Sequence, residues 1–296
     1  MAFGLGVGVL IGLTGIGGGS LMTPLLILFA GVQPVVAIGT DLAYGAVTKT
    51  VGGWRHLRLG TVDIGVSKWL AVGSVPGSLV GVLLLNRLQE RYGHGFESVL
   101  LVVVAAVLLL VSLSVLFRAL FLRGAVEREV AKVQMSRGRK MAAVVIGATL
   151  GLVLGLTSVG SGALIGFALI LVFRLTPHRV VGTDVFHAAI LLWTAGIAHW
   201  VSGNVDLTLM ANILAGSLPG VWIGTALVPR VSADGLRPAL GCVLLGSALG
   251  VFTKAGADIP VPAIVGLPAL AGLLAYGAHR ARRGDPPPVL ASEDVR

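Results

Sequence analysis

The sequence predicts an all-α polytopic membrane protein that consists of two homologous halves. Hydrophobic residues make up 55% of the 296 residues, and charged residues make up only 12%, about half of the fraction found in soluble domains. The chain also repeats itself at a fixed offset of 143 residues, without a gap. A duplicated apolar unit whose segments are interrupted by glycine at matching positions is typical of secondary transporters.

Glycine-rich and acidic motifs make the repeat visible. The segment GLTGIGGG at residues 12–19 returns as GLTSVGSG at residues 155–162. The remaining matches are Gly39-Thr40-Asp41 with Gly182-Thr183-Asp184, His56 with His199, Asp63 with Asp206, and Pro76-Gly77 with Pro219-Gly220.

Each half is expected to hold four membrane elements, because a bilayer span needs about 20 apolar residues. The elements lie at about 3–29, 35–57, 67–85 and 98–122 in the first half, and at about 144–173, 178–200, 208–228 and 236–252 in the second. We therefore divide the chain into a first transmembrane repeat (1–123), a basic cytoplasmic linker (124–140), a second transmembrane repeat with an extra apolar segment at 262–279 (141–279), and a disordered cytoplasmic tail (280–296).

The glycines divide the first element of each half into two pieces of about ten residues, each rising only about 15 Å. The element is therefore either a re-entrant hairpin or a broken helix that still crosses the bilayer. If both first elements are re-entrant and the last stretch crosses, 18 Lys and Arg residues lie on one side and 3 on the other. Because cytoplasmic loops are enriched in Lys and Arg, this split favours the re-entrant arrangement. The second half is then inverted relative to the first.

The two glycine-rich breaks predict a binding site for an anion. Broken backbone inside a bilayer is tolerated where it lines a cavity, and a helix that resumes after a break presents free N–H groups and a positive dipole end. Close helix packing is the alternative, and we accept it for the rows Gly4-Gly8-Gly12 and Gly147-Gly151-Gly155. The candidate substrate-binding residues are Thr14, Gly17, Gly18, Gly19, Ser20, Thr40, Thr157, Gly160, Ser161, Gly162 and Thr183.

Ionisable residues inside the spans are the candidates for coupling or gating, because such residues are expensive in a bilayer and usually functional. Asp41 and Asp184 could bind a coupling proton or could cap the neighbouring break. Lys49, whose counterpart is Leu192, could pair with Asp41, attract the anion, or extend to the membrane surface. The remaining candidates are His56, His187 and His199, with Asp63, Asp206 or a loop carbonyl as expected partners of His56 and His199.

These motifs resemble those of the TauE/SafE sulfite-exporter family, over most of residues 4–252. The resemblance is carried by the two glycine-rich segments, by AIGTD at 37–41, by GTVD at 60–63 and GNVD at 203–206, and by GSLPG at 216–220. It implies a multi-pass protein of the bacterial inner membrane that exports sulfite or small organosulfonates. Asp41 and Asp184 depart from the pattern, since many members carry Ser after Gly-Thr.

Other classes of protein fit the sequence less well. A passive anion channel would have the same composition and remains the alternative function. An intramembrane aspartyl protease lacks its Gly-x-Gly-Asp motif here, so we expect no enzyme, no cofactor and no metal site. The basic residues lie between apolar spans, which argues against nucleic acid as a partner. The expected partners are a small sulfite-like anion and the lipid bilayer, while proton coupling and a homo-oligomer stay open.

Overall fold

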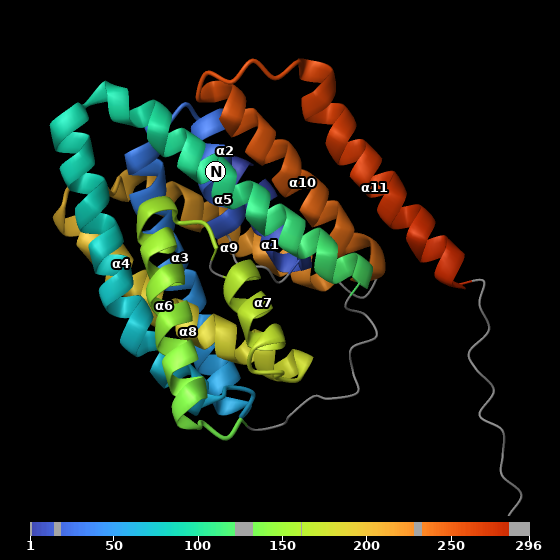
Figure 1. The fold of residues 1–296 in the computed structure, drawn as a ribbon. Coiled ribbons are helices and arrows are strands. Elements are labelled where there is room, and N and C mark those ends of the chain that lie inside the picture. Colours follow the sequence, from blue (N-terminus) through green and yellow to red (C-terminus); the bar gives the residue numbers. More distant parts are fainter. Residues whose placement is uncertain (1, 15–18, 122–132, 161, 228–232, 284–296) are drawn as a thin grey trace, which may run out of the picture.

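The computed structural model describes residues 2–14, 19–121, 133–160, 162–227 and 233–283. Every regular element within these ranges is a helix (Figure 1), which confirms the all-α class. The helices of the first half are α1 (Ala2–Thr14), α2 (Gly19–Leu28), α3 (Pro34–Arg58), α4 (Ile64–Tyr92) and α5 (His94–Phe121). Those of the second half are α6 (Arg137–Thr157), α7 (Ala163–Leu171), α8 (Pro177–Val201), α9 (Leu207–Leu227) and α10 (Ala233–Lys254), followed by α11 (Val261–Arg283).

The helix boundaries follow local signals in the sequence. Proline occupies the first turn of α3 and of α8, where its missing N–H costs nothing. The Asp63 side chain caps α4 by accepting a hydrogen bond from Val66 N–H. Ser136 caps α6 in the same way, so α6 begins at Arg137 and the last residues of the basic segment that we expected at 124–140 are helical.

Five described helices are long and apolar enough to cross a membrane: α4, α5, α6, α8 and α9. The chain is therefore a multi-pass membrane protein. Helix α3 is not among the five, although it is 25 residues long, because Asp41, Lys49 and the basic residues of its last turn lower its hydropathy. Length and composition alone thus leave out a helix that carries four of the candidate residues, Thr40, Asp41, Lys49 and His56.

The principal helix contacts join one half of the molecule to the other. Helix α1 packs on α9 and α6 packs on α4, while α3 packs on α8 and α5 packs on α10. The first two contacts are equivalent under the repeat, and glycines form both. A Cβ at Gly8 would overlap the backbone of Ser217, and a Cβ at Gly151 would overlap that of Ser74. These rows therefore serve close packing, as the alternative interpretation of the sequence proposed.

Contacts at both ends of α6 and α8 show that these helices run in the same direction. Asp63 accepts a hydrogen bond from Val133 N–H, just before α6, and its own N–H donates to Thr183 near the start of α8. At the other end, His199 contacts the Gly155 carbonyl oxygen. The segment between the two helices, which contains α7, must therefore lead back towards the start of α6, as Figure 1 shows.

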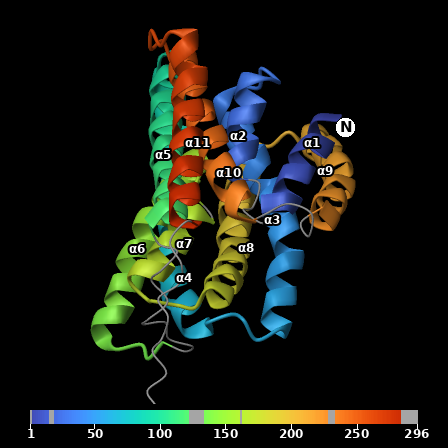
Figure 2. The same cartoon turned by 90° about the vertical axis from the view of Figure 1, so that its right-hand side faces the viewer.

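Helix α11 packs against α10 and α5 and has no counterpart in the first half. Figure 2 shows α11 beside α5 and α10, and none of its main contacts with the described helices is with α3, α7 or α8. The glycine-rich break before α7, together with α3 and α8, therefore forms its contacts without α11.

Candidate functional site

The second glycine-rich break lies between α6 and α7, and its described residues 158–160 and Gly162 are not helical. Ser158 has a left-handed backbone with φ of 60°, and Gly160 and Gly162 have φ of 118° and 105°. A left-handed serine is unusual. The Thr157 hydroxyl stabilises the turn, because it donates to the Val153 carbonyl and accepts from Val159 N–H.

Asp41 of α3 binds to this second break. Its Oδ2 atom accepts hydrogen bonds from the hydroxyls of Thr23 (2.6 Å) and Ser158 (2.7 Å). Thr23 lies in α2, so Asp41 connects a helix of its own half to the break of the other half. The side chain is fully buried, and its Oδ1 atom has no hydrogen-bond partner among the described residues.

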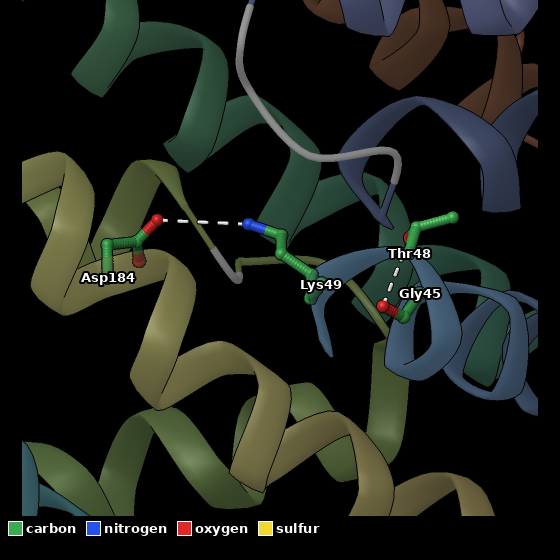
Figure 3. Close-up of polar contacts among 4 residues, drawn as sticks. All are labelled: Gly45, Thr48, Lys49 and Asp184. Carbon is green, nitrogen blue, oxygen red and sulfur yellow. Dashed lines mark hydrogen bonds and ion pairs between the residues drawn. The ribbon is translucent and has the colours of Figure 1, made fainter. Parts of the chain in front are cut away.

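Asp184 of α8 binds to the same break through different groups. Its carboxylate accepts from the Gly162 backbone N–H, and its Oδ2 atom lies 3.9 Å from the Lys49 ammonium nitrogen. Figure 3 shows Lys49 of α3 extending towards the Asp184 carboxylate. Both side chains are more than nine-tenths buried. Lys49 thus forms an ion pair with Asp184 of the other half, rather than with Asp41, and it does not extend to the surface.

Arg118 of α5 is a second cation at this place, and the sequence analysis missed it. Its guanidinium interacts electrostatically with Asp184, and its Nη1 atom lies 3.2 Å from where a Cβ on Gly166 would be. Arg118 was not among the candidate site residues, although it lies within the membrane element expected at 98–122. The available signal was that Arg118 precedes Leu120-Phe121-Leu122 and so is still within the apolar stretch.

Thr40 and Thr183 occupy equivalent positions and make equivalent contacts between the halves. The Thr40 hydroxyl accepts from Asp206 N–H at 3.0 Å, and the Thr183 hydroxyl accepts from Asp63 N–H at 2.8 Å. Each hydroxyl thus holds the first turn of a helix in the other half. A role of these hydroxyls in anion binding stays a prediction.

Tyr44 and His187 form a second equivalent pair of contacts, one helical turn beyond the aspartates. Tyr44 faces Ser217, and the His187 Nε2 atom lies 3.2 Å from the Ser74 hydroxyl. Ser74 and Ser217 are themselves related by the repeat offset. A search for repeated polar residues, and not only for repeated glycines, would have identified both serines.

His56 and His199 also contact equivalent residues. His56 Nδ1 lies 2.9 Å from the Thr61 hydroxyl, and His199 Nδ1 lies 3.2 Å from the Asn204 amide. Neither is in contact with Asp63 or Asp206, which instead cap α4 and α9. His199 does bind a carbonyl, that of Gly155, but this belongs to α6 and not to a loop.

The structure brings together Asp41, Lys49, Asp184 and the second break, and places the two histidines at the helix ends. The Ser20 hydroxyl, at the start of α2, is buried without a hydrogen-bond partner among the described residues. Gly19 begins α2. Gly17, Gly18, Ser161 and the side chain of Thr14 lie outside the part of the chain that the structure describes.

No group of three or more His, Cys, Asp and Glu side chains within the described ranges could hold a metal ion. The polar atoms around the second break are hydroxyls, carboxylates, an ammonium group and a guanidinium. This set is suited to binding and releasing a small charged solute.

Comparison with known proteins agrees with this description. Residues 1–251 match the family model described as sulfite exporter TauE/SafE. Over 246 residues the chain is 39% identical to the probable membrane transporter protein YjnA of Bacillus subtilis, an alignment that covers 83% of this chain and 96% of that protein. It is 28% identical to the probable membrane transporter protein YdhB of the same organism, covering 81% and 96%.

A more distant match is the sulfite exporter TauE/SafE family protein 1 of Arabidopsis thaliana, 34% identical over 87 residues, which cover 29% of this chain and 19% of that protein. No solved structure matches the chain. Helix α11 lies beyond the residues that the family model matches.

Proposed function

Since this chain belongs to the TauE/SafE sulfite exporter family of membrane transporters, we propose that it exports small sulfur-containing anions, such as sulfite or organosulfonates, across the inner membrane of a bacterium. The anion is held at the middle of the membrane, where the glycine-rich breaks of the two halves meet. The name of the family and that of the Arabidopsis relative support the choice of anion.

One observation carries the proposal: buried polar atoms near the second break have no hydrogen-bond partner within the part of the chain that the structure describes. Lys49 Nζ, Asp184 Oδ1 and Asp41 Oδ1 have no hydrogen-bond partners among the described residues. Buried polar groups are nearly always hydrogen-bonded in folded proteins, and an unpaired buried group costs about 1–3 kcal/mol. A cluster of such groups beside a helix break is suited to a polar solute that enters and leaves.

The proposed architecture is an inverted repeat with re-entrant first elements. Its support is the equivalent packing of α1 on α9 and of α6 on α4, together with the antiparallel contact of α3 with α8, in which Gly45 lies against Leu192 and Gly53 against Phe186. The parallel course of α6 and α8 further supports a hairpin that enters and leaves on one side. Transporters of this kind expose a central site alternately to the two sides of the membrane.

The architecture is tested by cysteine labelling in intact cells. Cys242 is the only cysteine, so replacing it with Ala gives a background for single cysteines at Arg137 and at Ser202. We expect an impermeant maleimide to label residue 202 in intact cells and residue 137 only after permeabilisation. Labelling of residue 137 from outside would refute the proposed orientation.

The function is tested with purified protein in liposomes loaded with sulfite. We expect efflux well above that of protein-free liposomes, and competition by organosulfonates when they are present on the same side. Cells that lack the protein should also retain more sulfite. If the reconstituted protein moved neither sulfite nor any organosulfonate, the proposed substrate class would be wrong.

A further inference from the structure

Three charged side chains from three helices interact beside the second break. Lys49 comes from α3, Asp184 from α8 and Arg118 from α5, and Asp184 interacts with both cations. If Asp184 is ionised, the group carries one net positive charge. The excess charge lies next to a helix N-terminus, which also favours an anion.

The Lys49 ammonium is poorly satisfied in this arrangement. Charge-assisted hydrogen bonds between nitrogen and oxygen are typically about 2.7–2.9 Å long, whereas the Lys49 nitrogen lies 3.9 Å from Asp184 Oδ2. It has no hydrogen-bond partner among the described residues, although it is buried. As far as the described residues go, its three N–H donors are therefore left for a further acceptor.

The Asp184 carboxylate occupies the place where an external anion would bind. Gly162 is the N-cap residue of the nine-residue helix α7, and its backbone N–H donates to Asp184. An ammonium group and a helix N-terminus thus converge on one carboxylate. Both kinds of group are used by proteins to bind oxyanions.

Resting on the proposed function, we infer that Lys49 is the anion-binding cation of the transport site and that Asp184 is an internal carboxylate that the transported anion displaces. The anion takes over the contacts with Lys49 and with the Gly162 N–H. Arg118 keeps the displaced Asp184 carboxylate paired, so that no buried charge is left without a partner. Lys49 and Arg118 together pair with the Asp184 carboxylate and with one compact oxyanion that carries a single negative charge, such as hydrogen sulfite or a small sulfonate.

The test is equilibrium binding of methanesulfonate, a singly charged sulfonate, to purified protein by calorimetry. We expect Lys49→Met to weaken binding by at least about tenfold, because a charge-assisted hydrogen bond in a buried site is lost. Asp184→Asn should instead strengthen binding, by about tenfold, because the competing charge is gone while the amide still fills the space. Lys68→Met is the matched control, since Lys68 is an exposed lysine on α4. This variant should bind methanesulfonate with the affinity of the unaltered protein.

The opposite signs distinguish this mechanism from a structural ion pair. In a structural pair both substitutions would destabilise the site and weaken binding together, and that result would overturn the inference. Unchanged affinity in Lys49→Met would also overturn it. The double variant Lys49→Met/Asp184→Asn loses both members of the ion pair together, so it should elute as folded protein, and it should bind more weakly than Asp184→Asn because it lacks the ammonium group.

Failure of the proposed function would give a different result from failure of the role inferred for Lys49. If the unaltered protein moves no sulfite or sulfonate in liposomes, the substrate class is wrong, whatever the variants do. If it transports these anions and Lys49→Met transports them equally well, the substrate class stands and the assignment of Lys49 is wrong.

Discussion

Asp41 and Asp184 occupy equivalent positions in the two halves, but their surroundings differ. Asp41 accepts hydrogen bonds from two hydroxyls, those of Thr23 and Ser158. Asp184 faces the Lys49 ammonium, the Arg118 guanidinium and a backbone N–H of the break. One carboxylate is held by short hydrogen bonds to neutral groups, and the other by charges at a longer distance.

The repeat explains how this difference arose. The residue that matches Thr23 in the second half is Gly166, and the residue that matches Lys49 is Leu192. A hydroxyl donor is thus missing beside Asp184, and a cation is missing beside Asp41. The acidic residue is thus present in both halves with different partners: Asp41 connects helices, whereas we infer that Asp184 exchanges partners.

The largest effect is expected from Gly162→Leu, which should abolish anion transport while the protein still reaches the membrane. Gly162 has φ of 105°, where a residue with a side chain is strained, and its N–H is one of the groups that we assign to the anion. Sulfite efflux from liposomes is the measurement.

The control for this substitution is Gly138→Leu in the first turn of α6. A Cβ at Gly138 meets nothing within 4 Å, and the residue is exposed, so efflux should stay near that of the unaltered protein. Full activity in Gly162→Leu would show that the break has a packing role only.

The next largest effect is expected at the two aspartates, and it concerns two modes of transport: exchange of one anion for another, and uphill accumulation. If Asp184 carries a coupling proton, Asp184→Asn should still exchange anion for anion but lose at least about tenfold in uphill accumulation driven by a pH gradient, because the amide cannot titrate. In Asp41→Asn the amide oxygen can still accept hydrogen bonds from both hydroxyls. The ratio of uphill transport to exchange should therefore stay as in the unaltered protein.

Both modes are measured in the same liposomes, with and without an imposed pH gradient. If Asp41→Asn rather than Asp184→Asn lost only the uphill mode, the assignment of roles would have to be reversed. Uphill transport that survives in the double variant would eliminate both aspartates as the coupling group and leave a channel-like mechanism as the better description.

A smaller effect is expected from Thr23→Val, which removes one of the two hydroxyl donors to Asp41 and keeps the shape of the side chain. We expect a loss of about 1–2 kcal/mol in stability, seen as a lower midpoint of thermal unfolding, with anion affinity little changed. Thr48→Val is the control, since the Thr48 hydroxyl donates only within its own helix, to Tyr44 and Gly45 carbonyls. Equal losses of stability in the two variants would mean that the hydrogen bond from Thr23 to Asp41 contributes no more than a hydrogen bond within one helix.

The sequence predicted the fold far better than it predicted the site. Apolar stretches and the repeat identify every described helix, because a bilayer imposes length and composition on its spans. The partners of a polar residue are not fixed in this way. Asp41 and Ser158 are 117 residues apart and lie in different halves, and only the packing of α3 beside the second break brings them together.

The same limit explains why the sequence left three possible roles open for Lys49. Its position on α3 leaves its direction open, and its true partner Asp184 lies on α8, in the other half. Repeat symmetry offered no help, because Leu192 is the counterpart of Lys49. Symmetry showed that Thr40 matches Thr183 and that Asp63 matches Asp206, but the contacts of Thr40 with Asp206 and of Thr183 with Asp63 were not predicted.

The last comparison concerns Thr40 and Thr183, where the two halves agree, and the smallest effect of all is expected at Thr40. Thr183→Val leaves the N–H of Asp63 without its acceptor in a buried place, and this should cost about 1–2 kcal/mol. Thr40→Val frees the N–H of Asp206, which is exposed, so water replaces the hydroxyl and the loss should be under about 1 kcal/mol. Thermal unfolding of the two purified variants measures this difference.

Transport by the same two variants decides between two roles for these hydroxyls. If each threonine only holds the first turn of a helix in the other half, both variants should export sulfite at rates that follow their stability. If either variant lost anion affinity while its unfolding midpoint stayed unchanged, that hydroxyl would contact the anion directly, as the sequence predicted. If only one of the two threonines gave this result, only one half of the molecule would use its threonine to bind the anion. The two halves would then differ at the threonines as well as at Asp41 and Asp184.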